Sequence, residues 1–150
     1  MTAVLAPCAG RVIALADVDD PVFAAEMVGP GAAIEPEDGD TVVIAPISGT
    51  IAKIHPHAFA MSTAEGVAVL VHLGINTVRL GGVGFEVLAI EGSTVQAGDP
   101  MVRWNPATIT GENMATTVMV VALDRPAGSL TSPLLGEHVA TGATLFTVDA

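Results

Sequence analysis

The 150-residue chain contains no tyrosine, only four phenylalanines and a single tryptophan, Trp104. Hydrophobic residues nevertheless make up 51% of the chain, which excludes a disordered polymer. Because aromatic residues are so few, the core must be built from aliphatic side chains. A chain of this length buries about 70% of the surface that it exposes when extended. We therefore expect one domain over residues 1–150, stable without disulfides.

Cysteines and basic residues are also scarce. Cys8 is the only cysteine, which excludes an internal disulfide and a zinc site built on cysteines. Five Lys and Arg stand against 16 Asp and Glu, for a net charge of -11. This balance argues against nucleic acids and anionic membranes as partners, because both bind clustered cations. A basic partner protein would instead be attracted.

Long apolar runs and a signal peptide are missing as well. No run approaches the roughly 20 apolar residues that a membrane-spanning helix needs. Met1 leads almost directly into the segment APCAG, which lacks the apolar stretch of a secretory signal. These absences predict a cytoplasmic protein that does not insert into membranes.

The residues that are present predict an all-β fold. Short β-branched runs alternate with turn signals such as GPG at 29–31, EDGD at 37–40 and AGDP at 97–100. This spacing favours an antiparallel β-sandwich or barrel-sandwich hybrid over alternating βαβ units. The expected strands are 11–15, 41–46, 50–54, 66–73, 85–90, 100–104, 117–123 and 144–148.

Helices should be few, and the chain repeats itself. Asp20 can cap one short helix, with Pro21 in its first position and Gly29 beyond its end. A second short turn is expected within 106–114. The segment APCAGRV returns as APISGTI, and STVQAGDPMV is echoed by EHVATGATLF. These echoes predict two related, intertwined halves.

His72 is the first candidate for chemistry, in the strand VAVLVHL. Even-numbered residues of this strand share a face, which places His72 beside Leu70. An imidazole among apolar residues must be hydrogen-bonded, metal-bound or reactive. Gly74 follows closely and allows the backbone to approach whatever the ring binds.

His57 is the second candidate, in the segment HPHAFAM, which we interpret as part of another apolar strand. If the preceding strand continued straight, His55, His57 and Phe59 would share a face, although Pro56 makes that strand irregular. A solvated loop position is the simplest interpretation of His55. His138 lies in a turn segment and is interpreted as a surface residue.

Two chemistries fit a pair of imidazoles. They could bind zinc with a third ligand, and the only nearby carboxylate for such a site is Glu65. Alternatively, one neutral imidazole could attack a phosphoryl group while the other donates an N–H to its oxygens. The chain has no nucleotide-binding glycine loop, so ATP is not expected as the direct phosphoryl donor.

The sequence resembles the glucose-type IIA components of the bacterial phosphoenolpyruvate:sugar phosphotransferase system. The resemblance runs nearly end to end and is carried by DPVFAAEMVGPGAAI, APISGTIAKIHPHAFAM, GVAVLVHLGINTVRLGGVGFE and EGSTVQAGDPMVRW. It implies a β-sandwich acting as a phosphotransferase component through a phosphohistidine, without a cofactor or a metal. The free-standing domain would be a monomer.

The resemblance also implies roles for single residues. His72 would accept the phosphoryl group from the carrier protein HPr and pass it to a cysteine on a IIB domain. His57 would stabilise the transferred group by hydrogen bonding. A shallow apolar depression for partner binding would be lined or rimmed by Phe23, Met27, Val28, Phe59 and Leu70.

The chain departs from the family pattern at two positions beside these residues. His55 stands where many relatives have a threonine, and Asn76 replaces an aspartate that some relatives carry. Which sugar is transported, and whether the chain is natively fused to other domains, does not follow from these residues.

Two other classes of protein share parts of the pattern. Lysostaphin-type zinc peptidases have a related β architecture and use His-x-His ligands, as the HPH segment could suggest. Lipoyl and biotinyl carrier domains have similar Val-x-x-Gly corners but need a lysine at a hairpin tip. Lys53 is the only lysine, and it lies inside an expected strand.

Overall fold

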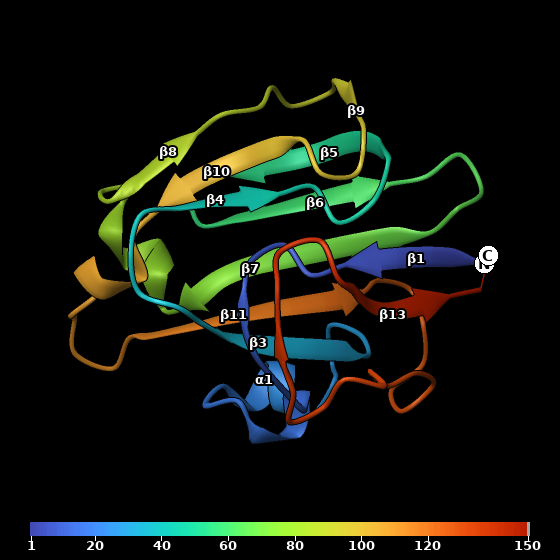
Figure 1. The fold of residues 1–150 in the computed structure, drawn as a ribbon, viewed down its shortest axis with the longest axis horizontal. Helices are drawn as coiled ribbons and strands as arrows, with labels where there is room; N and C mark the ends of the chain where they lie inside the picture. The colour runs from blue at the N-terminus through green and yellow to red at the C-terminus, as the bar shows by residue number, and fades with distance from the viewer. Residues whose placement is uncertain (150) are drawn as a thin grey trace.

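The computed structural model describes residues 1–149, and these fold into antiparallel sheets with very little helix. All strand pairs within this range are antiparallel, which confirms the predicted fold class (Figure 1). In chain order the elements are β1 (Thr2–Leu5), β2 (Gly10–Ile13), η1 (Leu15–Asp17), α1 (Pro21–Ala24), β3 (Gly31–Pro36), β4 (Thr41–Ile44), β5 (Gly49–His55), β6 (Ala58–Ser62), β7 (Ala68–Ile75), η2 (Thr77–Leu80), β8 (Phe85–Val87), β9 (Thr94–Val95), β10 (Pro100–Trp104), η3 (Pro106–Thr108), β11 (Ala115–Ala122), β12 (His138–Val139) and β13 (Thr144–Val148).

One large sheet and two smaller ones make up the sandwich. The large sheet has eight strands in the order β12-β2-β3-β11-β7-β6-β5-β9, and β4-β10-β8 form a three-stranded sheet. Strands β1 and β13 pair with each other near the chain ends (Figure 1). The inner face of the large sheet packs on the other sheets through a core that is almost entirely aliphatic, apart from Trp104, Phe59 and Phe146.

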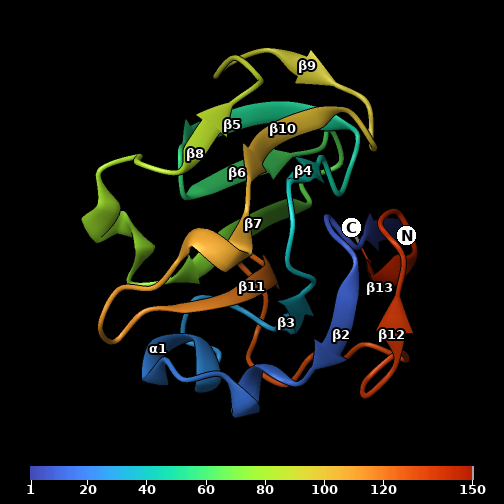
Figure 2. The same cartoon turned by 60° about the vertical axis from the view of Figure 1, so that its left-hand side comes forward.

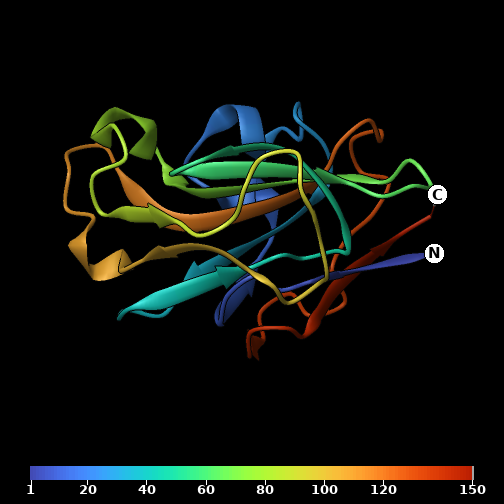
Figure 3. The same ribbon diagram turned by 90° about the horizontal axis from the view of Figure 1, so that it is seen from above.

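The outer face of the large sheet carries a smaller apolar cluster beneath the segment that contains η1 and α1. Leu15, Val18 and Phe23 from this segment pack on Met119 and neighbouring residues of the sheet. Viewed from above, α1 and the three-stranded sheet lie on opposite sides of the large sheet (Figure 3). Figure 2 shows β7, β11 and β3 side by side in the large sheet with α1 next to them, and β7 leads into η2 after its end at Ile75.

The two predicted halves are visible in the hydrogen bonds. Ala6 exchanges backbone hydrogen bonds with residues 142 and 143, and Ala45 exchanges the corresponding bonds with residues 98 and 99. In the same way, β12 adds to β2 and β9 adds to β5. Each sequence echo therefore forms an equivalent corner, which confirms the intertwined repeat.

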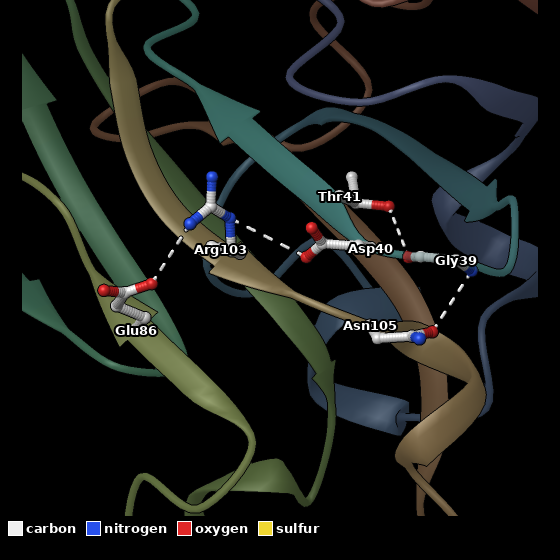
Figure 4. A network of polar contacts seen from close by, with 6 residues as sticks. All are labelled: Gly39, Asp40, Thr41, Glu86, Arg103 and Asn105. Atoms are coloured by element: carbon white, nitrogen blue, oxygen red, sulfur yellow. Dashed lines mark hydrogen bonds and ion pairs between the residues drawn. The ribbon is translucent and has the colours of Figure 1, made fainter.

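A polar network links the strands of the three-stranded sheet on its exposed side (Figure 4). The Arg103 guanidinium lies between Asp40 at 3.7 Å and Glu86 at 3.4 Å, and so joins the start of β4 to β8. Asn105 Oδ1 accepts a hydrogen bond from the Gly39 N–H at 3.1 Å. All three charged side chains are exposed, so the network orders the turn before β4 but contributes little free energy of unfolding.

Several predicted elements differ from the structure. The strand expected over 11–15 ends at Ile13 and is followed by η1, and the strand expected over 85–90 ends at Val87. The capped helix forms as predicted but is a single turn, because Glu26 adopts a left-handed backbone with φ 56°. The second turn is a short 3-10 helix, η3. None of the helices within residues 1–149 is long and apolar enough to cross a bilayer.

Candidate functional site

His72 lies on the outer face of the large sheet and shares that face with Leu70, as the alternation in β7 predicts. Val69, Val71 and Leu73 point into the core and are fully buried, whereas Ala68, Leu70 and His72 are only partly covered. The neighbours of His72 across the sheet are Ala58 on β6 and Met119 on β11. The imidazole is therefore half-buried in an apolar setting but open to the outside.

His57 meets His72 from the neighbouring hairpin, although not from a strand. The prediction that His57 belongs to an apolar strand is wrong, because Pro56 and His57 form the turn between β5 and β6. The His57 carbonyl accepts the backbone N–H of Leu73 at 2.7 Å, which fixes the turn against β7. The two ring centroids lie 5.2 Å apart, with the planes crossing at 73°.

The hydrogen bond from His72 Nδ1 to the Gly74 carbonyl, at 2.7 Å, determines the tautomer. A carbonyl oxygen only accepts, so Nδ1 must carry the proton. The neutral ring then has its lone pair on Nε2, the nitrogen on the other side of the ring. In the neutral ring a single atom, Nε2, therefore carries the free lone pair.

Gly74 is required for this hydrogen bond in two ways. Its φ of +86° is a conformation that side chains disfavour, and an added Cβ would lie 2.5 Å from Thr77 Cγ2 and 2.7 Å from the Ala115 carbonyl oxygen. Thr77 cannot easily move, because it is fully buried and its hydroxyl donates to the Leu73 carbonyl at 2.6 Å. The glycine therefore allows the backbone approach that was expected from the sequence.

Replacing Gly74 with alanine should destabilise the chain and disturb the His72 tautomer. Gly66→Ala is a matched control, since Gly66 has a φ of +88° with nothing within 4 Å of the added Cβ. We expect Gly66→Ala to cost about 1–2 kcal/mol for the left-handed backbone. Gly74→Ala should cost about 1–3 kcal/mol more because it crowds a packed site. Urea unfolding measures both, and equal losses would contradict the steric argument.

The surroundings of both histidines favour the neutral imidazole. Burial lowers the pKa of His72, against smaller opposing effects of its hydrogen bond to Gly74 and of the Asp20 carboxylate. Burial also lowers the pKa of His57, and the nearby His72 and His55 lower it further. Both rings are consequently neutral at pH 7, as nucleophilic attack requires.

These lowered pKa values predict a dependence of stability on pH. The unfolded chain binds protons on these histidines near pH 6.5, whereas the folded chain resists protonation until a lower pH. The free energy of unfolding should therefore be greatest above pH 6.5 and fall as the pH drops toward the folded-state values. Urea unfolding at pH 7.5 and 5.5 tests this, and the fall should be smaller in the double variant His57→Gln, His72→Gln. An equal fall in the double variant would assign the effect to other groups.

The five residues predicted to line the partner surface separate into two groups. Phe23 is 8% exposed, and its ring lies 5.4 Å from that of His72, so it forms an apolar wall beside His72. Val28 and Leu70 pack at the edge of the same cluster. Met27 is 75% exposed nearby on the chain. All four belong to the outer face or to the segment that covers it.

Phe59 does not belong to this surface, and its assignment there is wrong. It pairs with Val71 and is 1% exposed within the core between the sheets. The prediction came from the family resemblance, and a straight continuation of β5 through Pro56 would also have placed Phe59 on the same face as His57. The turn interrupts that register, so His57 and Phe59 are not successive residues of one face.

Two residues, Asp20 and His55, make contacts at the site that were not predicted from the sequence. Asp20 was assigned only as a helix cap, and its side chain does accept the N–H groups of Val22 and Phe23 at 2.9 and 3.3 Å. By holding Phe23 it also shapes the wall beside His72. His55, interpreted as a solvated loop residue, stacks on His57 with centroids 5.9 Å apart. Its i, i+2 spacing from His57 was the only signal in the sequence.

Neither alternative class of protein fits this arrangement. Within residues 1–149, no group of three or more His, Cys, Asp or Glu side chains is placed to hold a metal ion, in contrast to a zinc peptidase. Lys53 lies within β5 and pairs with Glu91 at 4.0 Å, so it is not the hairpin-tip lysine of a lipoyl or biotinyl domain. An open hollow of about 390 Å³ beside Arg103 and Trp104 belongs to the other sheet and does not include the histidines.

Comparison with known proteins gives a consistent result. Residues 2–127 match the family described as phosphoenolpyruvate-dependent sugar phosphotransferase system, EIIA 1. The glucose-specific EIIA component of Staphylococcus aureus strain Mu50 is 43% identical over 105 residues, which are 69% of this chain and 62% of that protein. The glucose-specific EIICBA component of Streptococcus pneumoniae is 44% identical over 114 residues, which are 75% of this chain and 15% of that protein.

A solved structure extends the similarity to the whole fold. The glucose permease IIA from Mycoplasma capricolum superposes with a TM-score of 0.82 and 32% identity, covering 97% of this chain and 94% of that one. The family match alone covers most of the chain, including both histidines. The chain therefore belongs to the EIIA 1 family of the phosphoenolpyruvate-dependent sugar phosphotransferase system.

Proposed function

We propose that the chain is a phosphoryl carrier in sugar uptake, with His72 Nε2 as the atom that is phosphorylated. The observation that carries the proposal is the hydrogen bond from His72 Nδ1 to Gly74, which leaves the lone pair on Nε2 of a neutral ring. Such a relay would work in the cytoplasm, between a phosphorylated HPr and a IIB domain.

Acceptance is an in-line transfer between two histidines. The Nε2 lone pair of His72 forms a bond to phosphorus, while the bond between phosphorus and the HPr histidine breaks and its electron pair returns to that ring. The Nδ1 proton of His72 stays in place throughout, held by the Gly74 carbonyl. No proton has to leave the nucleophile, so no general base is needed.

Onward transfer reverses this step toward a different nucleophile. A cysteine thiolate on the IIB domain attacks phosphorus, and the P–N bond to His72 breaks with its electron pair returning to Nε2. His72 ends as the neutral ring with which it began. His57, with its centroid 5.2 Å away, is the group that can donate an N–H to the phosphoryl oxygens in both steps.

The surroundings of His72 suit docking to proteins. Phe23 and Leu70 are apolar neighbours on the same face, and Val78 on η2 is an exposed apolar residue that follows β7. An apolar rim covered by a partner would keep water from the phosphohistidine. The net charge of -11 would attract a basic partner such as HPr.

The acceptor is proposed from the architecture of relatives. Two relatives carry names that combine an A component with B and C components. These are the EIICBA component of Streptococcus pneumoniae and the EIIBCA component of Corynebacterium glutamicum. We accordingly propose a IIB domain as the acceptor. The relatives named above are glucose-specific, which makes glucose the first sugar to test.

Labelling of the purified chain tests the proposal directly. The chain is incubated with phosphoenolpyruvate, enzyme I and HPr, and its intact mass is followed. The proposal requires the gain of one phosphoryl group that is labile to acid, as a phosphohistidine is. A chain that stays unmodified while HPr is phosphorylated would overturn it.

A further inference from the structure

Three imidazoles, not two, form a continuous group on this side of the molecule. The ring of His57 lies between the other two, with centroids 5.9 Å from His55 and 5.2 Å from His72. The two contacts differ in kind. The planes of His55 and His57 are nearly parallel at 21°, whereas His57 meets His72 nearly edge-on at 73°.

The hairpin builds this stack from a short sequence. His55 ends β5 and pairs with Ala58, and Ala58 pairs in turn with His72, so the three residues form one row across the sheet. His57 lies in the turn next to this row. Pro56 separates the two stacked residues with a fixed φ. A Cβ added to Gly82 would lie 3.2 Å from Pro56 Cγ, so the loop after η2 packs closely on the turn.

We propose that His55 is a positioning residue, whose ring holds the imidazole of His57 edge-on against His72. This inference rests on the proposed function, since it assigns His55 to the same phosphoryl relay. In this role the exposed His55 acts through its stacking on His57 and not by contact with the nucleophile or the transferred group. A flat ring on one side of His57 removes rotamers that would turn its N–H away from His72.

The charges near the stack agree with such a role. His57 is faced by His55 from β5 and by His72 from β7, while Asp20 is the carboxylate that acts on His72. Lys53, which precedes His55 on β5, is paired with Glu91 at 4.0 Å. His55 also contributes to the lowered pKa of His57, which keeps that ring neutral in the free chain.

Two variants separate the stacking role of His55 from the chemistry of its ring nitrogens. His55→Ala removes the whole ring, and His55→Phe keeps a flat ring without an ionisable nitrogen. His138→Ala is the matched control, because His138 is an exposed histidine on β12 that pairs with Glu37. The thermal unfolding midpoint of each variant verifies that substitution at these exposed positions leaves the fold intact.

Two readouts are measured for each variant. Nitrogen-15 NMR of the unphosphorylated chain reports the tautomer and the titration of His57 and His72. Single-turnover transfer from the phosphorylated chain to a IIB domain reports the relay. We expect His55→Ala to slow transfer about 10-fold, as modest misplacement of a catalytic group does. His55→Phe should stay within about 2-fold of the wild type, and His138→Ala should not differ from it.

The two readouts also distinguish failure of this inference from failure of the proposed function. If the wild-type chain relays phosphoryl groups and His55→Ala does so equally fast, the positioning role is wrong. If His55→Phe is as slow as His55→Ala, stacking is not the mechanism and the inference is overturned. If the wild-type chain accepts no phosphoryl group, the proposed function fails. In that case the NMR signals of His57 in the unphosphorylated chain still test the positioning role. If His57 has the same tautomer in His55→Ala as in the wild type, the inference is overturned.

Discussion

His72→Gln should take up no phosphoryl group from phosphoenolpyruvate, enzyme I and HPr, a loss of at least about 10³-fold, as expected when the nucleophile of a covalent relay is removed. A glutamine amide nitrogen has its lone pair delocalised into the carbonyl and does not attack phosphorus. The amide still provides an N–H that could donate to the Gly74 carbonyl, so the fold should persist. Intact mass spectrometry after incubation with the phosphorylated donor measures the effect.

The control for this result is a histidine of the same chain that lies elsewhere. His138→Gln changes an exposed imidazole on β12 and should label as fast as the wild type. Circular dichroism and urea unfolding verify that His72→Gln remains folded. Full labelling of a folded His72→Gln chain would show that another residue is the nucleophile. Peptide mapping of the phosphorylated site would then begin with His57.

The fold could be predicted because local signals and the tertiary structure agree. The alternation in β7 indicated that Ala68, Leu70 and His72 share a face. The structure has these three residues half-buried on the face opposite the fully buried Val69, Val71 and Leu73. The repeated segments around Ala6 and Ala45 predicted equivalent corners. Strand β3 was missed because its residues 31–36, GAAIEP, include a single β-branched residue, Ile34. Pairing with β11 and β2 makes this segment extended.

The sequence predicted that His57 and His72 come together, but it did not predict the full geometry of the site. His72 could be placed because a strand fixes the direction of its side chains. His57 and Phe59 could not be placed, because the turn at Pro56 shifts the register. No local signal indicates which face of the sheet each residue takes when the chain enters β6. The contacts of His55 and Asp20 depend on how the hairpin and α1 pack on β7. Such contacts are set by tertiary structure and not by spacing in the sequence.

His57→Gln should still accept a phosphoryl group but should pass it on about 10²–10³-fold more slowly, the loss expected when one preorganised donor to a charged transition state is removed. In the proposed relay, the HPr donor would bring basic residues of its own to the phosphoryl oxygens during acceptance, so His57 would be one donor among several. Once the dianionic phosphoryl group lies on His72, its charge opposes the burial that lowers the pKa of His57. The imidazole can then take up a proton and stabilise the charge that spreads over the phosphoryl oxygens during transfer to a thiolate. An amide donates a hydrogen bond but cannot become charged.

Measuring the two half-reactions separately tests this argument. Rapid-quench labelling by phosphorylated HPr gives the acceptance rate, and decay of the isolated phosphorylated chain in the presence of a IIB domain gives the transfer rate. The wild-type transfer rate should also respond to pH as the phosphorylated site gains a proton on His57, and this response should be absent in His57→Gln. Equal losses in both steps would mean that His57 only maintains the shape of the turn. No loss in either step would remove it from the relay, and the edge-on approach of the two rings would then have only a packing role.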